Sequence, residues 1–270
     1  MRIESVEDRF SHAKTLVIEA GKLALGYFRS PRLVIEEKGL QDLVTVADRE
    51  VEAFLVAGLH AAFPPDAFFG EESGPQGDSQ QTEATWVIDP IDGTSNFARG
   101  IDLWCISVGL VVENEVVMGF VYRPAGDELF NAVKGKGASL NGQPIRVSST
   151  SAWEHTRIDL GFSFRRPEQL YLTAIDRLFG VRAEHARLAS AALGMAYVAC
   201  GRYDGYWEAH VNSWDVAGGL CLVTEAGGKT NAFLAGTGLT HGNPVLASNA
   251  QLYDRLTALF GDLHAPGAKG

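Results

Sequence analysis

The sequence predicts an α/β protein in which helices and sheets form layers, and three observations support this. Apolar residues have helical spacing near the N-terminus, paired strands with glycine-rich turns follow, and strands alternate with helices in the second half. Such alternation is typical of layered α/β folds. A chain of 270 residues is long for one core and short for two domains. We therefore expect one compact unit with an N-terminal half, residues 1–150, and a C-terminal half, residues 151–264.

The N-terminal half begins with two predicted helices. Apolar residues recur every three or four positions over residues 6–28, and Pro31 should stop this helix. A second helical pattern spans residues 48–63 and ends at a pair of prolines. Residues 103–124 are typical of two long strands around Glu113-Asn114, and shorter strands with Asn-Gly turns follow. This order predicts an antiparallel sheet.

The C-terminal half alternates between strand and helix patterns, which predicts a mixed α/β arrangement. We expect strands over residues 156–162, near Val181, and over residues 204–209 and 243–248, and helices over residues 168–180, 188–200, 214–226 and 249–260.

Composition and charge exclude several classes of protein. The formal charge is −10 and the basic residues are scattered, so a nucleic-acid partner is not expected. No apolar run is long enough to cross a membrane, and the acidic N-terminus does not look like a targeting segment, so we expect a cytoplasmic protein without a membrane partner. An acidic protein can still bind an anionic substrate if metal cations lie between its carboxylates and the ligand.

Two aspartates three positions apart, Asp89 and Asp92, follow a short apolar strand pattern that Pro90 and Gly93 should interrupt. Their mutual repulsion is tolerable only if a cation neutralises them or one is protonated. Oxygen ligands without histidine or cysteine favour Mg²⁺ over zinc. After Gly93, the hydroxyls of "TS" and the start of a helix would suit a phosphate group. The stretch therefore predicts a site for metal ions and a phosphoryl group.

Other carboxylates allow both a functional and an ordinary interpretation. Glu71 and Glu72 follow an apolar pair and a glycine, but such pairs are often exposed surface. Asp48 and Asp215 each lie near the start of a predicted helix, where an aspartate commonly acts as a cap. The residues alone leave these alternatives open.

Four segments together resemble the inositol monophosphatase family of Mg²⁺-dependent, lithium-sensitive phosphatases. They are residues 42–52, "GEES" at 70–73, "WVIDPIDGTSNF" at 86–97 and "WDVAGGLCLVTEAGG" at 214–228. The resemblance covers most of the chain and implies the layered αβαβα sugar-phosphatase fold, with hydrolysis of a small phosphate monoester. It also implies a homodimer, since members are commonly dimers.

By this resemblance the chain would bind two to three Mg²⁺ ions. Glu71, Asp89 and the main-chain carbonyl of Ile91 would hold the first ion. Asp89, Asp92 and Asp215 would hold the second, and Glu71 would reach a weaker third ion partly through water.

The resemblance also implies catalytic roles. Glu71 and Thr94 would orient and deprotonate a water activated by the metal, and Asp48 would hold Thr94 by a hydrogen bond. The N–H groups of Gly93 and Thr94 would bind phosphate oxygens.

Substrate contacts follow from the same comparison. The implied residues are Asp92, Ala189, Ser190, Ala191, Glu208 and Asp215. The chain departs from many relatives at Ala189, where they have glycine, and from some animal members at Asn212, where they have histidine. Inositol-1-phosphate is the first candidate substrate. Fructose-1,6-bisphosphate, NADP, histidinol phosphate and 3′-phosphoadenosine phosphate are the alternatives within the superfamily.

Three other classes stay open on the residues alone. A haloacid-dehalogenase-type phosphatase also has an Asp-Gly-Thr motif, but one residue separates its aspartates, whereas two separate Asp89 from Asp92. A glycosidase would also use paired carboxylates. A non-catalytic protein could keep the fold without the activity.

Overall fold

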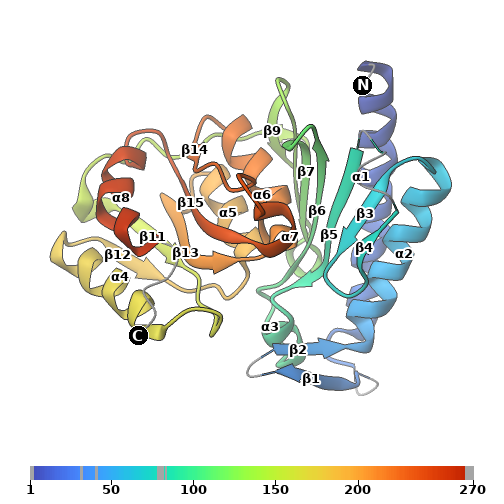
Figure 1. Cartoon of the computed structure of the whole chain (residues 1–270), viewed down its shortest axis with the longest axis horizontal. Coiled ribbons are helices and arrows are strands. Elements are labelled where there is room, and N and C mark those ends of the chain that lie inside the picture. Colours follow the sequence, from blue (N-terminus) through green and yellow to red (C-terminus); the bar gives the residue numbers. More distant parts are fainter. Residues whose placement is uncertain (1–2, 31–32, 40–41, 78–81, 83, 265–270) are drawn as a thin grey trace.

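The molecule consists of five alternating layers of helices and sheets (Figure 1). The structure is a computed structural model that describes residues 3–30, 33–39, 42–77, 82 and 84–264. The order of layers is a helix pair, an eight-stranded sheet, a second helix pair, a five-stranded sheet and an outer helix pair. The predicted αβαβα arrangement is therefore confirmed.

The first two layers come from the N-terminal part of the chain. Helices α1 (Ile3–Tyr27) and α2 (Val46–Ala62) pack together and cover one face of the large sheet through a core that includes Leu55, Trp86 and Phe120. Along the sheet the strands are β10 (Gln143–Pro144), β9 (Gly137–Leu140), β8 (Glu128–Val133), β7 (Glu115–Arg123), β6 (Cys105–Val112), β5 (Ala84–Asp92), β3 (Ala67–Gly70) and β4 (Gly74–Gln76). A hairpin of β1 (Ile35–Gly39) and β2 (Asp42–Thr45) precedes α2.

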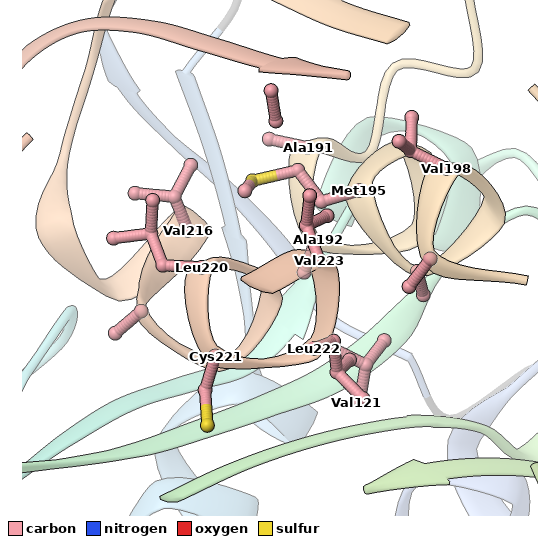
Figure 2. Packing of buried hydrophobic residues seen from close by; sticks show 14 of the residues in the cluster. Val121, Ala191, Ala192, Met195, Val198, Val216, Leu220, Cys221, Leu222 and Val223 are labelled. Atoms are coloured by element: carbon pink, nitrogen blue, oxygen red, sulfur yellow. The ribbon is translucent and has the colours of Figure 1, made fainter. Parts of the chain in front are cut away.

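The central layer consists of two nearly continuous apolar helices, α5 (Ala191–Ala199) and α6 (Ser213–Glu225). Figure 2 shows side chains from both helices, among them Met195 and Leu220, in the cluster between the sheets. Both helices are apolar almost all round because each lies between two sheets. The short helix α3 (Thr94–Ala98) directly follows β5.

The second sheet and the outer helices complete the fold. Its strands, in spatial order, are β12 (Glu184–Ala186), β11 (Arg157–Leu160), β13 (Gly205–Val211), β15 (Asn243–Ser248) and β14 (Lys229–Thr230). A third apolar cluster packs α4 (Glu168–Gly180) and α8 (Tyr253–Phe260) onto this sheet, and the short helix α7 (Gly238–His241) lies beside α6. Short 3₁₀ turns are at Pro124–Gly126, Trp153–His155 and Gly261–His264.

Most element predictions are confirmed, and a few details are wrong. The β6–β7 hairpin turns at Glu113 and Asn114, which have φ of 49° and 61°, as a tight hairpin turn requires. The strand expected near Val181 is wrong, because that residue ends α4 and β12 begins at Glu184. The first sheet is antiparallel except for its β3–β5 pair. Pro31 lies outside the described residues, although α1 does end at Tyr27.

The helices of the described residues include none with the length and apolar character that crossing a membrane requires. The division of the chain into halves at residue 150 stays a prediction.

Candidate metal and phosphate site

Asp89 and Asp92 lie at the end of β5, where this central strand becomes irregular. Asp89 pairs with Ser107 of β6, Asp92 pairs with Cys105, and the register shifts between them. The expectation that Pro90 and Gly93 prevent a simple continuation of the strand is confirmed: β5 extends to Asp92 and ends before Gly93, but its pairing with β6 is irregular at Pro90. The proline lies within the irregular pair, where the missing N–H interrupts no regular ladder bond.

Three carboxylates meet at this point of the fold. Oxygen atoms of Asp89, Asp92 and Asp215 all lie within 4.8 Å of one another, although Asp215 comes from α6, far along the chain. Burial, followed by the charges of Glu71, Asp92 and Asp215, raises the pKa of Asp89 well above its usual value. Burial and the charge of Asp92 raise the pKa of Asp215 to about 7. The cluster is thus costly to ionise without a cation.

Asp92 lies in a cradle of hydrogen-bond donors. Its Oδ2 accepts from the Ser190 hydroxyl at 2.6 Å and from the Ala192 N–H at 2.7 Å, and its Oδ1 accepts from the Ala191 N–H at 3.2 Å. The Cys105 thiol lies 3.6 Å from Oδ2. Burial raises the pKa of Asp92, and the donors from residues 190–192 oppose that effect. The first turn of α5 therefore fixes this carboxylate.

Asp48 and Asp215 occupy the same position in their helices. Each is the third helical residue, and its Oδ2 accepts from the backbone N–H of the N-cap residue, Thr45 or Asn212, at 2.8 Å and 2.9 Å respectively. Such capping boxes satisfy donors at a helix start. The capping interpretation is therefore correct for both residues. It does not exclude a functional one, because Asp215 also belongs to the carboxylate cluster and Asp48 also contacts Thr94 beside it.

Asp48 joins the start of α2 to the turn after β5. Its Oδ1 lies 3.1 Å from the Thr94 hydroxyl, which also lies 2.9 Å from the carbonyl oxygen of Ile91. The hydroxyl of Thr45 donates to Oδ2 at 2.5 Å. Burial is the main cause that raises the pKa of Asp48 to about 6. The threonine side chain is thus held in one orientation beside the carboxylate cluster.

Gly93 connects β5 to α3 in a conformation that other residues rarely adopt. Its φ is 94°, and a Cβ atom there would lie 3.0 Å from the Leu103 carbonyl oxygen and 3.3 Å from that of Ala189. The first N–H groups of α3, at Thr94 and Ser95, have no partner within the helix. Glycine therefore lets the chain turn tightly and present these groups next to the carboxylates.

Glu71 and Glu72 follow β3, and a buried acid of α2 holds their loop. Glu52 is 2% exposed, and its two carboxylate oxygens accept from the Glu72 N–H at 2.9 Å and the Ser73 N–H at 2.8 Å. The Glu71 N–H donates to the Ile88 carbonyl of β5 at 3.1 Å. These bonds fix the loop against the strand that carries Asp89.

A cavity of about 910 Å³ opens onto this cluster. Sequence-predicted residues that line it are Glu71, Asp92, Gly93, Thr94, Ala189, Ser190, Ala191, Glu208 and Asp215. Asp89 and Asp48 lie behind this surface and are buried, as is Ile91. The fold thus brings together all the predicted residues from segments far apart in the chain.

Glu208 is a buried carboxyl on the β13 wall of the cavity. Its Oε2 accepts from the Tyr206 hydroxyl at 2.6 Å, and burial raises its pKa to about 8. The Ser190 hydroxyl, which also lines the cavity, donates its hydrogen bond to Asp92. Ala189 has a φ of 58°, which a non-glycine residue adopts only under constraint.

The donor set fits a hard divalent cation. Asp89, Asp92 and Asp215 offer carboxylate oxygens at mutual distances that one ion can bridge, and hard cations prefer oxygen ligands. The neighbouring Cys105 does not add a thiolate, because burial raises the pKa of its thiol well above the usual value.

Sequence reasoning missed several residues of the site. Asp159 and Tyr206 line the cavity, and Glu52 and Asn96 hold the loops around it. Glu52 could have been recognised from the sequence, since it is a charged residue next to Val51 on the apolar face of a helix. A charged residue at such a position needs buried partners.

Comparisons with known proteins agree with this geometry. Residues 5–265 match the model of the inositol monophosphatase family. The chain is 40% identical over 233 residues to an inositol-1-monophosphatase of Synechocystis, which covers 83% of this chain and 78% of that protein. It is 34% identical over 247 residues to a protein of Escherichia coli named Nus factor SuhB, covering 90% of this chain and 92% of the relative.

Solved structures show the same architecture. The crystal structure of a protein from Bartonella henselae described as extragenic suppressor protein suhB is 30% identical, with a TM-score of 0.86 and coverage of 94% of this chain and 98% of that one. An inositol monophosphatase from Anabaena is 32% identical, with a TM-score of 0.83 and coverage of 96% and 97%.

Proposed function

Because this chain belongs to the inositol monophosphatase family of phosphoric monoester hydrolases, we propose that it hydrolyses a small phosphate monoester with Mg²⁺. Inositol-1-phosphate is the first substrate we propose. The observation that carries the proposal is the carboxylate triad of Asp89, Asp92 and Asp215, within 4.8 Å, at the edge of a cavity that also meets the first turn of α3.

Two to three Mg²⁺ ions would bind at this cluster. Asp89, Asp92 and Asp215 would supply the shared carboxylates. Glu71, which lines the same cavity, and the carbonyl of Ile91 would complete the donor set. Bound cations would lower the pKa of a water molecule and neutralise charge on the phosphoryl oxygens. Their binding would also remove the repulsion that raises the pKa of Asp89.

The chain's own groups would then position the attacking water and the phosphate. Thr94 donates to Asp48 or to the Ile91 carbonyl, so its oxygen lone pairs remain able to accept a hydrogen bond from the attacking water. Glu71, on the same cavity wall, is the base that we assign to take the proton released by this water. The N–H groups of Gly93 and Thr94 would hold phosphate oxygens.

The leaving group would extend toward β13 and the start of α5. Glu208 has a carboxyl that can bind a ring hydroxyl, and Ala189 and Ala191 would contact the ring. A polyol such as inositol suits this wall because its hydroxyls can pair with buried carboxyls. The Ser190 hydroxyl contributes mainly through Asp92.

The test is phosphate release from inositol-1-phosphate by chelator-treated protein, with and without millimolar Mg²⁺. We expect no release without the metal and full recovery on its return, and inhibition by Li⁺. A panel with the other candidate esters ranks the substrates by kcat/KM. Metal-independent release, or a phospho-aspartyl intermediate trapped during turnover, would contradict the proposal.

A further inference from the structure

Asp159 is a buried acid beside the site with one carboxylate oxygen bonded and the other without a partner. It lies on β11, is 1% exposed and forms part of the cavity wall. Its Oδ1 accepts from the Leu188 N–H at 3.0 Å, and its Oδ2 has no hydrogen-bond partner among the described residues. Buried polar atoms are nearly always paired, so this arrangement calls for a reason.

The neighbouring helix makes room for this carboxyl. A Cβ atom at Gly194, inside α5, would lie 2.3 Å from Asp159 Oδ2 and 2.8 Å from the Tyr206 ring. Glycine within a helix is less favourable than alanine. Keeping Asp159 in this place therefore has two energetic costs, a glycine inside a helix and a buried carboxylate oxygen without a hydrogen bond among the described residues.

The group that Asp159 holds is the peptide of Leu188. Its N–H donates to Asp159, and its carbonyl accepts from the Asn96 side chain at 2.9 Å. The next residue, Ala189, has the constrained φ of 58°. Side chains from β11 and α3 therefore grip this strained segment from both sides.

The gripped segment leads directly to the cradle of Asp92. Ser190, Ala191 and Ala192 follow Leu188 within four residues and donate the hydrogen bonds that orient the Asp92 carboxylate. A shift of the Leu188 peptide would move all these donors together. The hydrogen bonds of Asp159 therefore reach the metal cluster through this segment, and the charge of Asp92 also acts directly on the Asp159 carboxyl.

We propose that Asp159 is a positioning residue for metal binding: it holds residues 188–192 so that they present Asp92 to the cations. This inference rests on the proposed function of Asp92 as a metal-binding carboxylate. The burial of Asp159 raises the pKa of its own carboxyl to about 7, so the protein keeps an acid here that is costly to ionise. Buried acids with a strongly raised pKa are found most often at functional sites.

The test compares Mg²⁺ affinity and thermal stability in Asp159→Ala, Asp159→Asn and a control. Asp159→Ala removes the acceptor for Leu188 and should weaken Mg²⁺ binding, measured by titration calorimetry without substrate, about tenfold. Asp159→Asn keeps an amide oxygen that can accept from Leu188, so it should recover most of that affinity.

Asp204→Ala is the matched control. Asp204 is also a buried acid, accepting from the Ser148 hydroxyl at 2.5 Å and the Arg157 N–H at 2.8 Å, but it does not line the cavity. It should lower the melting temperature without changing Mg²⁺ affinity. If Asp159→Ala does not fold, Asn96→Ala removes the donor to the Leu188 carbonyl, together with a 2.6 Å bond to the Leu103 carbonyl, and should also weaken Mg²⁺ binding.

Unchanged Mg²⁺ affinity in the Asp159→Ala protein, or in Asn96→Ala where the first does not fold, would overturn the inference. An equal loss in the Asp204→Ala control would do the same, because it would indicate general destabilisation. Failure of the proposed function is distinguishable, since wild-type protein would then release no phosphate from any ester.

Discussion

The Thr94 hydroxyl lies 3.1 Å from Oδ1 of Asp48, a residue 46 positions earlier in the chain. Thr45 donates to the other oxygen of the same carboxylate, which links the first turn of α2 to the turn after β5. A helix cap and the orientation of a proposed catalytic hydroxyl therefore depend on one buried aspartate.

Thr94→Val should lower kcat by roughly 10²–10⁴-fold, the usual contribution of a group that takes part in proton transfer. Valine has nearly the same shape but lacks the hydroxyl that Asp48 orients. Thr94→Ser keeps the hydroxyl and should recover most of the rate. Steady-state kinetics on inositol-1-phosphate measures this. Equal rates for the valine and serine variants would remove the hydroxyl from the mechanism.

Asp92→Asn and Asp89→Asn should both reduce turnover by roughly 10³-fold or more, since a bound metal supplies several kcal/mol of transition-state stabilisation. Their stabilities should differ. Asp89 accepts a hydrogen bond from the Ile91 N–H at 2.9 Å, so its neutralisation mainly removes the cost of burying a charge and the repulsion from neighbouring carboxylates, and should stabilise metal-free protein.

In Asp92→Asn an amide NH₂ would face donors from Ser190, Ala191 or Ala192. This variant should be less stable than Asp89→Asn by about 1–3 kcal/mol, the cost of leaving buried donors unpaired. Urea unfolding of metal-free protein measures the difference. A more stable Asp92→Asn would show that repulsion outweighs the cradle.

Glu52→Ala should impair activity without touching the substrate. The change leaves the N–H groups of Glu72 and Ser73 without their acceptor, so the free energy of unfolding should fall by about 1–3 kcal/mol and kcat/KM should also fall. The control is Glu50→Ala, on the same helix, where the exposed carboxylate accepts from the Tyr27 hydroxyl at 2.6 Å. Glu50→Ala should change stability by less than about 0.5 kcal/mol. Similar effects of the two substitutions would argue against a special role for Glu52.

Glu208 should make metal-free protein less stable as the pH rises. Burial raises its pKa to about 8, against an ordinary value of 4.5, so between these pH values the folded state holds a proton that the unfolded state has lost. The free energy of unfolding then decreases with pH in this window. The contribution from pH 5 to pH 8 is of the order of 3 kcal/mol.

Glu208→Gln removes this titration. Urea unfolding of wild-type and variant proteins at pH 5 and pH 8, both in chelator, should show a smaller decrease in the variant. An identical decrease in both proteins would indicate that Glu208 ionises normally. The decrease in the free energy of unfolding would then come from other buried acids, such as Asp159, whose pKa is raised by burial to about 7.

The spacing of apolar residues predicted most helices and strands, because burying one face of an element makes apolar residues recur with the period of that element. The helices α1 and α2 and the hairpin of β6 and β7 follow such patterns closely. The predicted strand near Val181 failed because a short strand of three residues carries too little periodicity to locate. The proline correctly indicated that β5 does not continue simply, but the register shift by which the strand still reaches Asp92 depends on its pairing with β6.

The local sequence indicated a cation and phosphate site around Asp89, Asp92 and Gly93, since closely spaced carboxylates beside a glycine carry a chemical signal without any structure. Only the tertiary structure decided how they are held. Asp215 reaches Asp89 because α6 lies between two sheets, and Asp92 is oriented by donors a hundred residues away. Glu52 and Asp159 act on backbone N–H groups of distant loops. Such partners meet only when the layers pack, because nothing in the local sequence of either one specifies the other.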